Sequence, residues 1–96
     1  MRRAAKVDRN QAEIVKALRK VGVSVQHLHS LGRGCPDILC GYRGRNFLFE
    51  LKAGKGKLTP DELTWATGWR GQIATVRTFD EALKIILDNC TNVRLR

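Results

Sequence analysis

Residues 35–52 decide the fold of this chain, and they read CPDILCGYRGRNFLFELK. Two mainly apolar runs surround a short polar segment that contains Gly44. Strand-like runs separated by a short glycine-containing segment indicate a β-hairpin. We expect the first strand at residues 37–41 and the second at residues 46–53.

The length of the hairpin loop decides which side chains meet. A loop with an even number of residues, two at 43–44 or four at 42–45, places Asp37 opposite Glu50. An odd-length loop without a bulge would turn Glu50 to the other face of the sheet. Because residues two apart in a strand share a face, Lys52 lies beside Glu50 while the apolar neighbours pack on the opposite face.

Two opposed carboxylates and a lysine predict a metal site. Residues directly opposite each other on antiparallel strands have Cβ atoms about 4.5 to 5.5 Å apart, so Asp37 and Glu50 repel unless a cation lies between them. Mg²⁺ commonly uses one or two carboxylates with water and substrate phosphate. Lys52 is then placed to orient or deprotonate a metal-bound water and to stabilise charge on a phosphate. The Leu51 carbonyl is a further candidate ligand, and the alternative is an ordinary surface charge cluster.

The composition indicates one small domain with a polyanionic partner. The 96 residues are 43% hydrophobic, which suits a single modest core spanning residues 1–96. Eighteen Lys and Arg against nine Asp and Glu give a net charge of +9, which favours nucleic acid as the partner. No apolar run approaches the roughly 20 residues that cross a bilayer, and the basic start lacks the apolar stretch of a secretory signal. We expect an intracellular protein without membrane contact.

The cysteines favour a reducing compartment. Cys35, Cys40 and Cys90 form an odd set without a CxxC pair, which argues against a disulfide framework. A zinc site that adds His27 and His29 to Cys35 and Cys40 is the alternative, although this spacing matches no common structural zinc pattern. We interpret Cys40 and Cys90 as small buried hydrophobes.

Capping signals and periodicity predict the remaining elements. We expect helices at residues 10–20, 60–69 and 79–89, strands at 23–29 and 73–76, and a loose basic lead at 1–7. Three pairs suggest capping boxes: Asn10 with Glu13, Thr59 with Glu62, and Thr78 with Glu81. A flexible basic loop is expected at residues 54–57. The resulting order is α-β-β-β-α-β-α in an α/β fold.

At several of these positions the chain resembles the PD-(D/E)XK nucleases, and within them the virus-type replication-repair nuclease (VRR-NUC) domains. The resemblance covers nearly the whole chain and is carried by Glu13, residues 34–37, the hairpin, residues 50–52, Glu62 and Trp65. It implies a PD-(D/E)XK nuclease core, with a mixed central sheet flanked by helices, that hydrolyses DNA phosphodiesters with Mg²⁺ or Mn²⁺. Stand-alone members of this group are similar to Holliday junction resolvases of DNA repair and recombination, which act as homodimers. A phage or viral source, in the cytoplasm of a bacterial or infected host cell, is the matching expectation.

Two glutamates need separate treatment. Glu13 matches the helix-one glutamate that helps to bind metal in such resolvases, so we expect it as an auxiliary catalytic acid and metal ligand. The alternative for Glu13 is a capping partner or a solvated helix residue. Glu62 departs from the resemblance, because the family usually has glutamine three residues before the tryptophan. Its capping role explains Glu62 without a part in the chemistry.

Basic residues supply the expected DNA contacts. The candidates are Lys55, Lys57, Arg43, Arg45, Arg2 and Arg3, with Lys6 and Arg9 behind them. Such cations bind phosphates in a salt-sensitive way and read few bases. Trp65 and Trp69, one helical turn apart, are interpreted as core or interface residues rather than as base-stacking residues.

The sequence therefore predicts a Mg²⁺-dependent endodeoxyribonuclease selective for branched DNA. The catalytic candidates are Asp37, Glu50, Lys52 and Glu13, and the metal ligands are Asp37, Glu50, Glu13 and the Leu51 carbonyl. The alternative is a noncatalytic basic protein that binds DNA or RNA and keeps the hairpin only as a scaffold.

Overall fold

The computed structural model describes residues 2–94, with side chains described over residues 10–90. Over this range the elements follow the expected order α-β-β-β-α-β-α, with one short 3-10 helix added. They are α1 (Arg2–Lys20), β1 (Ser24–His27), η1 (His29–Leu31), β2 (Ile38–Tyr42), β3 (Arg45–Leu51), α2 (Pro60–Gly68), β4 (Ala74–Val76) and α3 (Phe79–Arg94).

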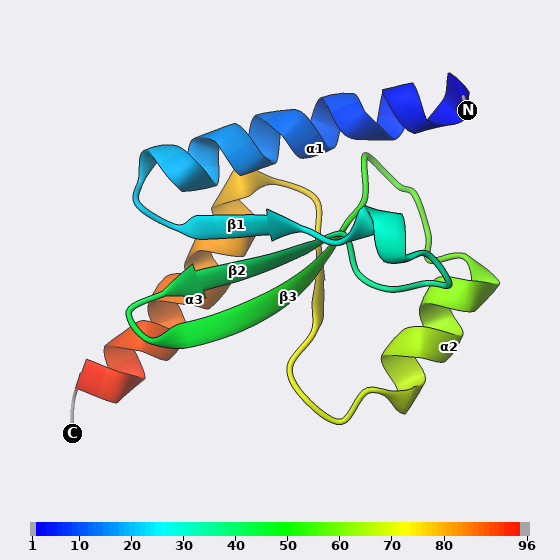
Figure 1. Ribbon diagram of the computed structural model, residues 1–96. Helices are drawn as coiled ribbons and strands as arrows, with labels where there is room; N and C mark the ends of the chain where they lie inside the picture. The colour runs from blue at the N-terminus through cyan, green and yellow to red at the C-terminus, as the bar shows by residue number, and fades with distance from the viewer. Residues whose placement is uncertain (1, 95–96) are drawn as a thin grey trace.

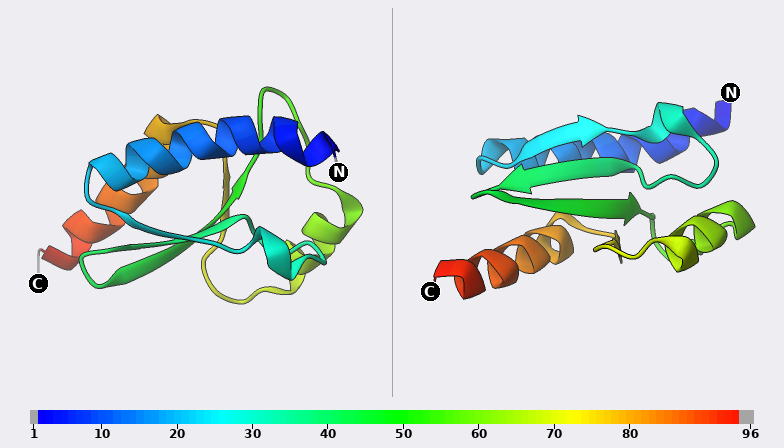
Figure 2. Two further views of the ribbon diagram at one scale, coloured as in Figure 1. Left: turned by 45° about the horizontal axis from the view of Figure 1, so that its top comes forward. Right: turned by 60° about the horizontal axis from the view of Figure 1, so that its bottom comes forward.

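The strands form a mixed sheet in the order β1-β2-β3-β4 (Figure 1). The pairs β1–β2 and β2–β3 are antiparallel, and β4 runs parallel to β3. A parallel neighbour needs a crossover connection, which the segment containing α2 provides. Figure 2 shows α2 and the hairpin tip at opposite ends of the sheet. The expected α/β class with a mixed sheet is therefore confirmed.

A two-residue turn at Arg43 and Gly44 closes the hairpin, and Tyr42 pairs with Arg45 across it. Both turn residues have positive φ, 51° and 80°. This is the requirement of a type I′ turn, whose twist matches that of the flanking strands. The expected even-length loop is confirmed.

The strand β2 begins at Ile38, so Asp37 lies just before the strand rather than in it. Ile38 pairs with Phe49, and this register brings Asp37 beside Glu50. The Asp37 amide donates to the Phe49 carbonyl at 3.1 Å, and Asp37 Oδ2 accepts from the Leu51 amide at 2.7 Å. Asp37 therefore brackets Glu50 through the residues on either side of it, instead of forming a regular strand pair with it.

The core lies between the sheet and the pair of helices α1 and α3. Leu18 from α1, Ile86 from α3 and Phe49 from β3 are fully buried. On α3, Ala82, Ile86 and Cys90 recur every four residues, so one stripe of the helix faces the sheet. Burying each large apolar side chain contributes about 1.5 to 3 kcal/mol, which fixes the sheet beneath the site.

The start of the chain differs from the expectation. Helix α1 begins at Arg2, so the loose basic lead at residues 1–7 and the Asn10 cap are wrong. Alanine, lysine and arginine dominate residues 2–6, and these residues favour helix. Within the described part of the chain, no helix is long and apolar enough to span a membrane.

Candidate active site

Asp37, Glu50 and Lys52 gather at the end of the hairpin opposite to its tip. Asp37 is fixed by the two hydrogen bonds that bracket Glu50. The Lys52 amide donates to the Val76 carbonyl at 3.1 Å, which continues the β3–β4 pairing past the end of β3. The backbone of each residue is thus held by a neighbouring strand.

Glu50 carries a buried carboxyl group, with only 4% of the residue exposed. Burial, followed by the nearby carboxylates of Asp37 and Glu62, raises the pKa of Glu50 to about 9. Lys52 Nζ lies 3.9 Å from Glu50 Oε2 but 2.7 Å from Glu62 Oε1. The positive charge of Lys52 is therefore paired mainly with Glu62 and not with Glu50. In the metal-free protein at neutral pH, Glu50 is therefore protonated.

Glu62 connects this cluster to the first turn of α2. Its Oε1 accepts from the Thr59 amide at 2.9 Å, and the Glu62 amide donates to the Thr59 hydroxyl at 3.2 Å. The expected capping box is confirmed, and the same carboxylate oxygen also binds Lys52. Partial burial works to raise the pKa of Glu62, but the hydrogen bonds from Lys52 and Thr59 outweigh it and lower this pKa. Glu62 is therefore ionised and holds the Lys52 ammonium.

A close approach at Gly34 explains why α2 reaches the site. Gly34 has φ +82°, and a Cβ there would overlap the Asp61 carbonyl and lie 2.9 Å from the Glu62 nitrogen. Only glycine combines this backbone conformation with this contact. The loop before Asp37 thus packs directly on the first turn of α2.

A cavity of about 140 Å³ lies under α2, beside the carboxylates. Glu50 and Glu62 line it together with apolar side chains that include Leu58 and Ile73. This apolar surround accounts for the desolvation of Glu50. Cys35 lies close by, and burial, followed by the charges of Glu50 and Asp37, raises the pKa of its thiol. A thiol that stays neutral is a poor nucleophile.

The expected role of Glu13 finds no support. Glu13 lies on the exposed face of α1. Among the described side chains, it forms no hydrogen bond or ion pair with Asp37, Glu50 or Lys52. Ile14 points into the core from this part of α1. Its neighbour Glu13 is turned by about 100° around the helix and therefore points outward.

The expected DNA contacts lie in different places. Lys55 and Lys57 are exposed in the loop that follows Lys52. Arg77 donates to the carbonyls of Gly54 and Gly56 at 3.0 and 2.8 Å, which connects this loop to the segment after β4; the expected flexibility of the loop stays a prediction.

The arginines of the hairpin tip are farther away. Arg43 and Arg45 are exposed at the tip, and Arg45 precedes Glu50 by five strand residues, a span of about 17 Å. They therefore lie too far away to contact a phosphate bound at Asp37. The side chains of Arg2 and Arg3 lie outside the described residues.

Trp65 and Trp69 stack on each other with ring centroids 4.7 Å apart. Neither tryptophan is buried, and Trp69 is 45% exposed, so the interpretation as core residues is wrong. The Trp69 indole donates to the Gln72 carbonyl at 3.2 Å. The interface interpretation stays a prediction.

The cysteines do not gather with the histidines. Cys40 and Cys90 are buried, as expected for small hydrophobes, and Cys90 Sγ lies 3.6 Å from the Tyr42 carbonyl. Over the described side chains, no group of three or more His, Cys, Asp or Glu has the geometry of a preformed metal site.

The residues at the cluster nevertheless suit a hard divalent cation. Asp37 and Glu50 offer carboxylate oxygens, which Mg²⁺ prefers. Burial first and the neighbouring carboxylates second raise the pKa of Glu50, and a cation there would offset both by favouring the ionised carboxylate. Two carboxylates, an adjacent peptide carbonyl and a lysine on one face can hold a cation and act on a phosphate. The expected Leu51 carbonyl ligand stays a prediction.

Comparison with known proteins leaves the chain without an assigned family. No protein-family model, no curated protein and no solved structure matches it significantly. The resemblance to VRR-NUC nucleases therefore rests on the residues quoted above.

Sequence reasoning underestimated two residues. The capping pattern located Glu62 but gave no sign that its carboxylate also binds Lys52. Gly34 was quoted only as part of the stretch before Asp37, and its contact with α2 joins residues far apart in sequence. The Thr59-Pro60-Asp61-Glu62 cap, which begins eight residues after the end of β3, was the available signal that a glutamate oxygen would be held in place there.

Proposed function

We propose that this chain is a metal-dependent endodeoxyribonuclease of the PD-(D/E)XK type, related to the VRR-NUC domains. The observation that carries the proposal is the buried Glu50 carboxyl group beside Asp37, with Lys52 within 4 Å of it. A buried group held against its ordinary protonation state is a sign of a functional site. A +9 chain also suits a polyanionic substrate.

The residues divide the work in the following way. Asp37 and Glu50 hold Mg²⁺ or Mn²⁺, and a bound metal supplies a water of lowered pKa and neutralises charge on the phosphate. Lys52 orients the attacking water and stabilises the charge that develops on the scissile phosphate. Glu62 fixes the position of the Lys52 ammonium through the 2.7 Å ion pair.

The proposed substrate is branched DNA such as a Holliday junction, and the proposed active form is a homodimer. Both rest on the resemblance, together with the small size of the chain. A two-fold dimer presents two equivalent sites to two strands, as symmetric cleavage requires.

A cleavage assay tests this function. Labelled four-way junction, flap and duplex DNA are incubated with wild type, Asp37→Asn, Glu50→Gln and Lys52→Ala, with Mg²⁺ or with a chelator. We expect cleavage by wild type with metal and a loss of at least about 100-fold in each variant, as for removal of a group that stabilises the transition state. Asp88→Asn is the matched control, because Asp88 is an exposed acid of α3.

Three results would count against the proposal. Cleavage that survives all three substitutions shows that Asp37, Glu50 and Lys52 are not the active site. Cleavage that persists in chelator shows that the reaction does not need the metal. DNA binding without cleavage under any metal condition favours the noncatalytic alternative.

A further inference from the structure

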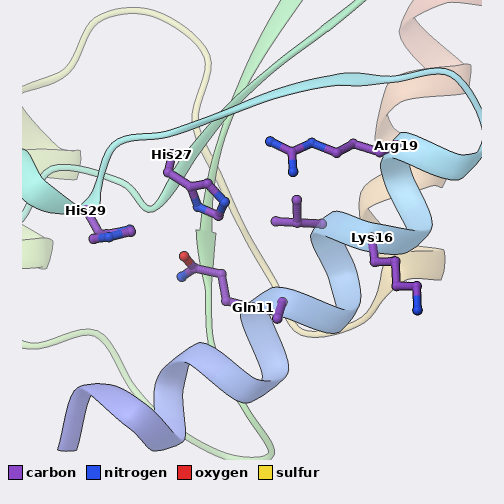
Figure 3. A pocket seen from close by; sticks show the side chains of 7 residues that line it. Gln11, Lys16, Arg19, His27 and His29 are labelled. Carbon is purple, nitrogen blue, oxygen red and sulfur yellow. The ribbon is translucent and has the colours of Figure 1, made fainter.

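An open groove of about 460 Å³ lies between α1 and the segment of β1 and η1 (Figure 3). Its polar lining consists of Gln11, Lys16, Arg19, His27 and His29. The remaining lining residues are apolar, so among the side chains described over residues 10–90 no acidic one lines this groove. A groove of this size is within the range of ligand sites.

Arg19 and Lys16, three residues apart on α1, both line the groove; the Arg19 guanidinium lies towards β1, while the Lys16 side chain points away from it (Figure 3). Arg19 Nη2 donates to the Val25 carbonyl at 2.9 Å, so the guanidinium reaches across to the free edge of β1. One of its five N–H donors is used in this bond, and others remain available to a ligand. Lys16 is exposed and extends outward from α1 (Figure 3).

Gln11 and the two histidines add further N–H donors. Gln11 is only 3% exposed, yet its amide extends toward the imidazoles, and it forms no hydrogen bond with another described residue (Figure 3). The rings of His27 and His29 lie 5.5 Å apart, edge to face. Amide and imidazole N–H groups suit phosphate oxygens as acceptors.

The groove lies next to the candidate active site through β1. His27 pairs with Ile38, the residue after Asp37, and the Leu28 amide donates to the Asp37 carbonyl at 2.8 Å. His27 faces the α1 side of the sheet and Glu50 faces the opposite side, towards α2, so a strand bound at Asp37 has to pass around the end of β1 to enter the groove.

We propose that this groove binds the phosphodiester backbone of the DNA substrate beside the phosphate that is cut, with Arg19 and Lys16 as its main cations. The inference rests on the proposed nuclease function and adds a substrate-binding surface to it. The groove fixes the path of the DNA strand on the α1 side of the site.

The test measures DNA binding apart from cleavage. Fluorescent four-way junction and duplex DNA are titrated in chelator, over a range of NaCl concentrations, with wild type and the double variant Lys16→Ala/Arg19→Ala. The matched control is Lys20→Ala/Lys84→Ala, which loses the same two charges from exposed positions outside the groove. Lys16→Arg/Arg19→Lys keeps both charges in place, and thermal melts verify that each variant folds.

We expect the groove variant to bind several-fold more weakly and to lose about two units of the slope of log K against log salt, at about 0.9 per phosphate contact. The control pair and the charge-conserving variant should stay near wild type. If the groove variant and the control pair lose the same amount of DNA affinity, the proposed binding site is wrong, because net charge alone then explains binding. Unchanged binding by the groove variant overturns it as well, while metal-dependent cleavage by wild type still supports the nuclease function. If wild type binds no DNA, the groove and the proposed function both fail.

Discussion

Glu50→Gln should stabilise the metal-free protein, although it removes a residue assigned to the site. Burial and two neighbouring carboxylates raise the pKa of Glu50 from the ordinary 4.5 to about 9. The unfolded chain releases this proton near pH 4.5, whereas the folded protein must keep it at pH 7. Each pH unit in between costs about 1.4 kcal/mol, which amounts to about 3 kcal/mol at pH 7.

Glutamine removes this cost because its amide stays neutral and still donates to a carboxylate. For a domain of this size, about 3 kcal/mol corresponds to a rise in Tm of about 12 to 24 °C. The sign of the pH dependence follows from the same shift. The folded state binds more protons between pH 4.5 and 9, so wild-type stability falls as pH rises through this window. The stability of Glu50→Gln should stay nearly level, and the two proteins should converge near pH 4.5.

Thermal melts in chelator at pH 5 to 8 measure both effects. Glu13→Gln is the matched control, because it makes the same chemical change at an exposed position of α1 and should leave Tm unchanged. Adding Mg²⁺ should raise the Tm of wild type more than that of Glu50→Gln, because ligand binding stabilises the folded state by mass action. A Glu50→Gln protein that melts no higher than wild type at pH 7, or with the same pH dependence, would refute the reasoning.

The contacts of α2 and the proposed homodimer give further predictions. Gly34→Ala should lower stability and cleavage together, because its Cβ overlaps the Asp61 carbonyl, whereas Gly44→Ala at nearly the same φ has open space and should lower Tm less; denaturation and cleavage assays compare them. Glu62→Ala should lower kcat while Glu62→Gln, which keeps the acceptor for Lys52, should restore much of it, and equal kcat values in the two variants would contradict the positioning role. Light scattering should report about twice the 10.8 kDa chain mass, and a strict monomer at assay concentration would count against the resolvase-like dimer.

Short-range rules predicted much of the fold correctly. The Arg43-Gly44 turn is a local feature with positive φ, so its length and the hairpin register follow from neighbouring residues. The Thr59 cap is equally local, because the hydroxyl and the carboxylate reach amides three residues away. The predicted start of the first helix at residue 10 was wrong. The Asn10 and Glu13 pattern indicated a helix start there, but the residues before Asn10 have high helix propensity and extend the helix back to Arg2.

The order of the elements, the even hairpin loop and the approach of Asp37 to Glu50 can all be predicted from the amino-acid sequence. Those features depend on turn geometry and on the two-residue period of strands, both of which act over a few residues. The burial of Glu50 and the contact of Glu62 with Lys52 could be seen only once the elements are packed together. These outcomes depend on the packing of α2 against the loop at Gly34, which joins segments more than twenty residues apart and leaves no periodic trace in the chain.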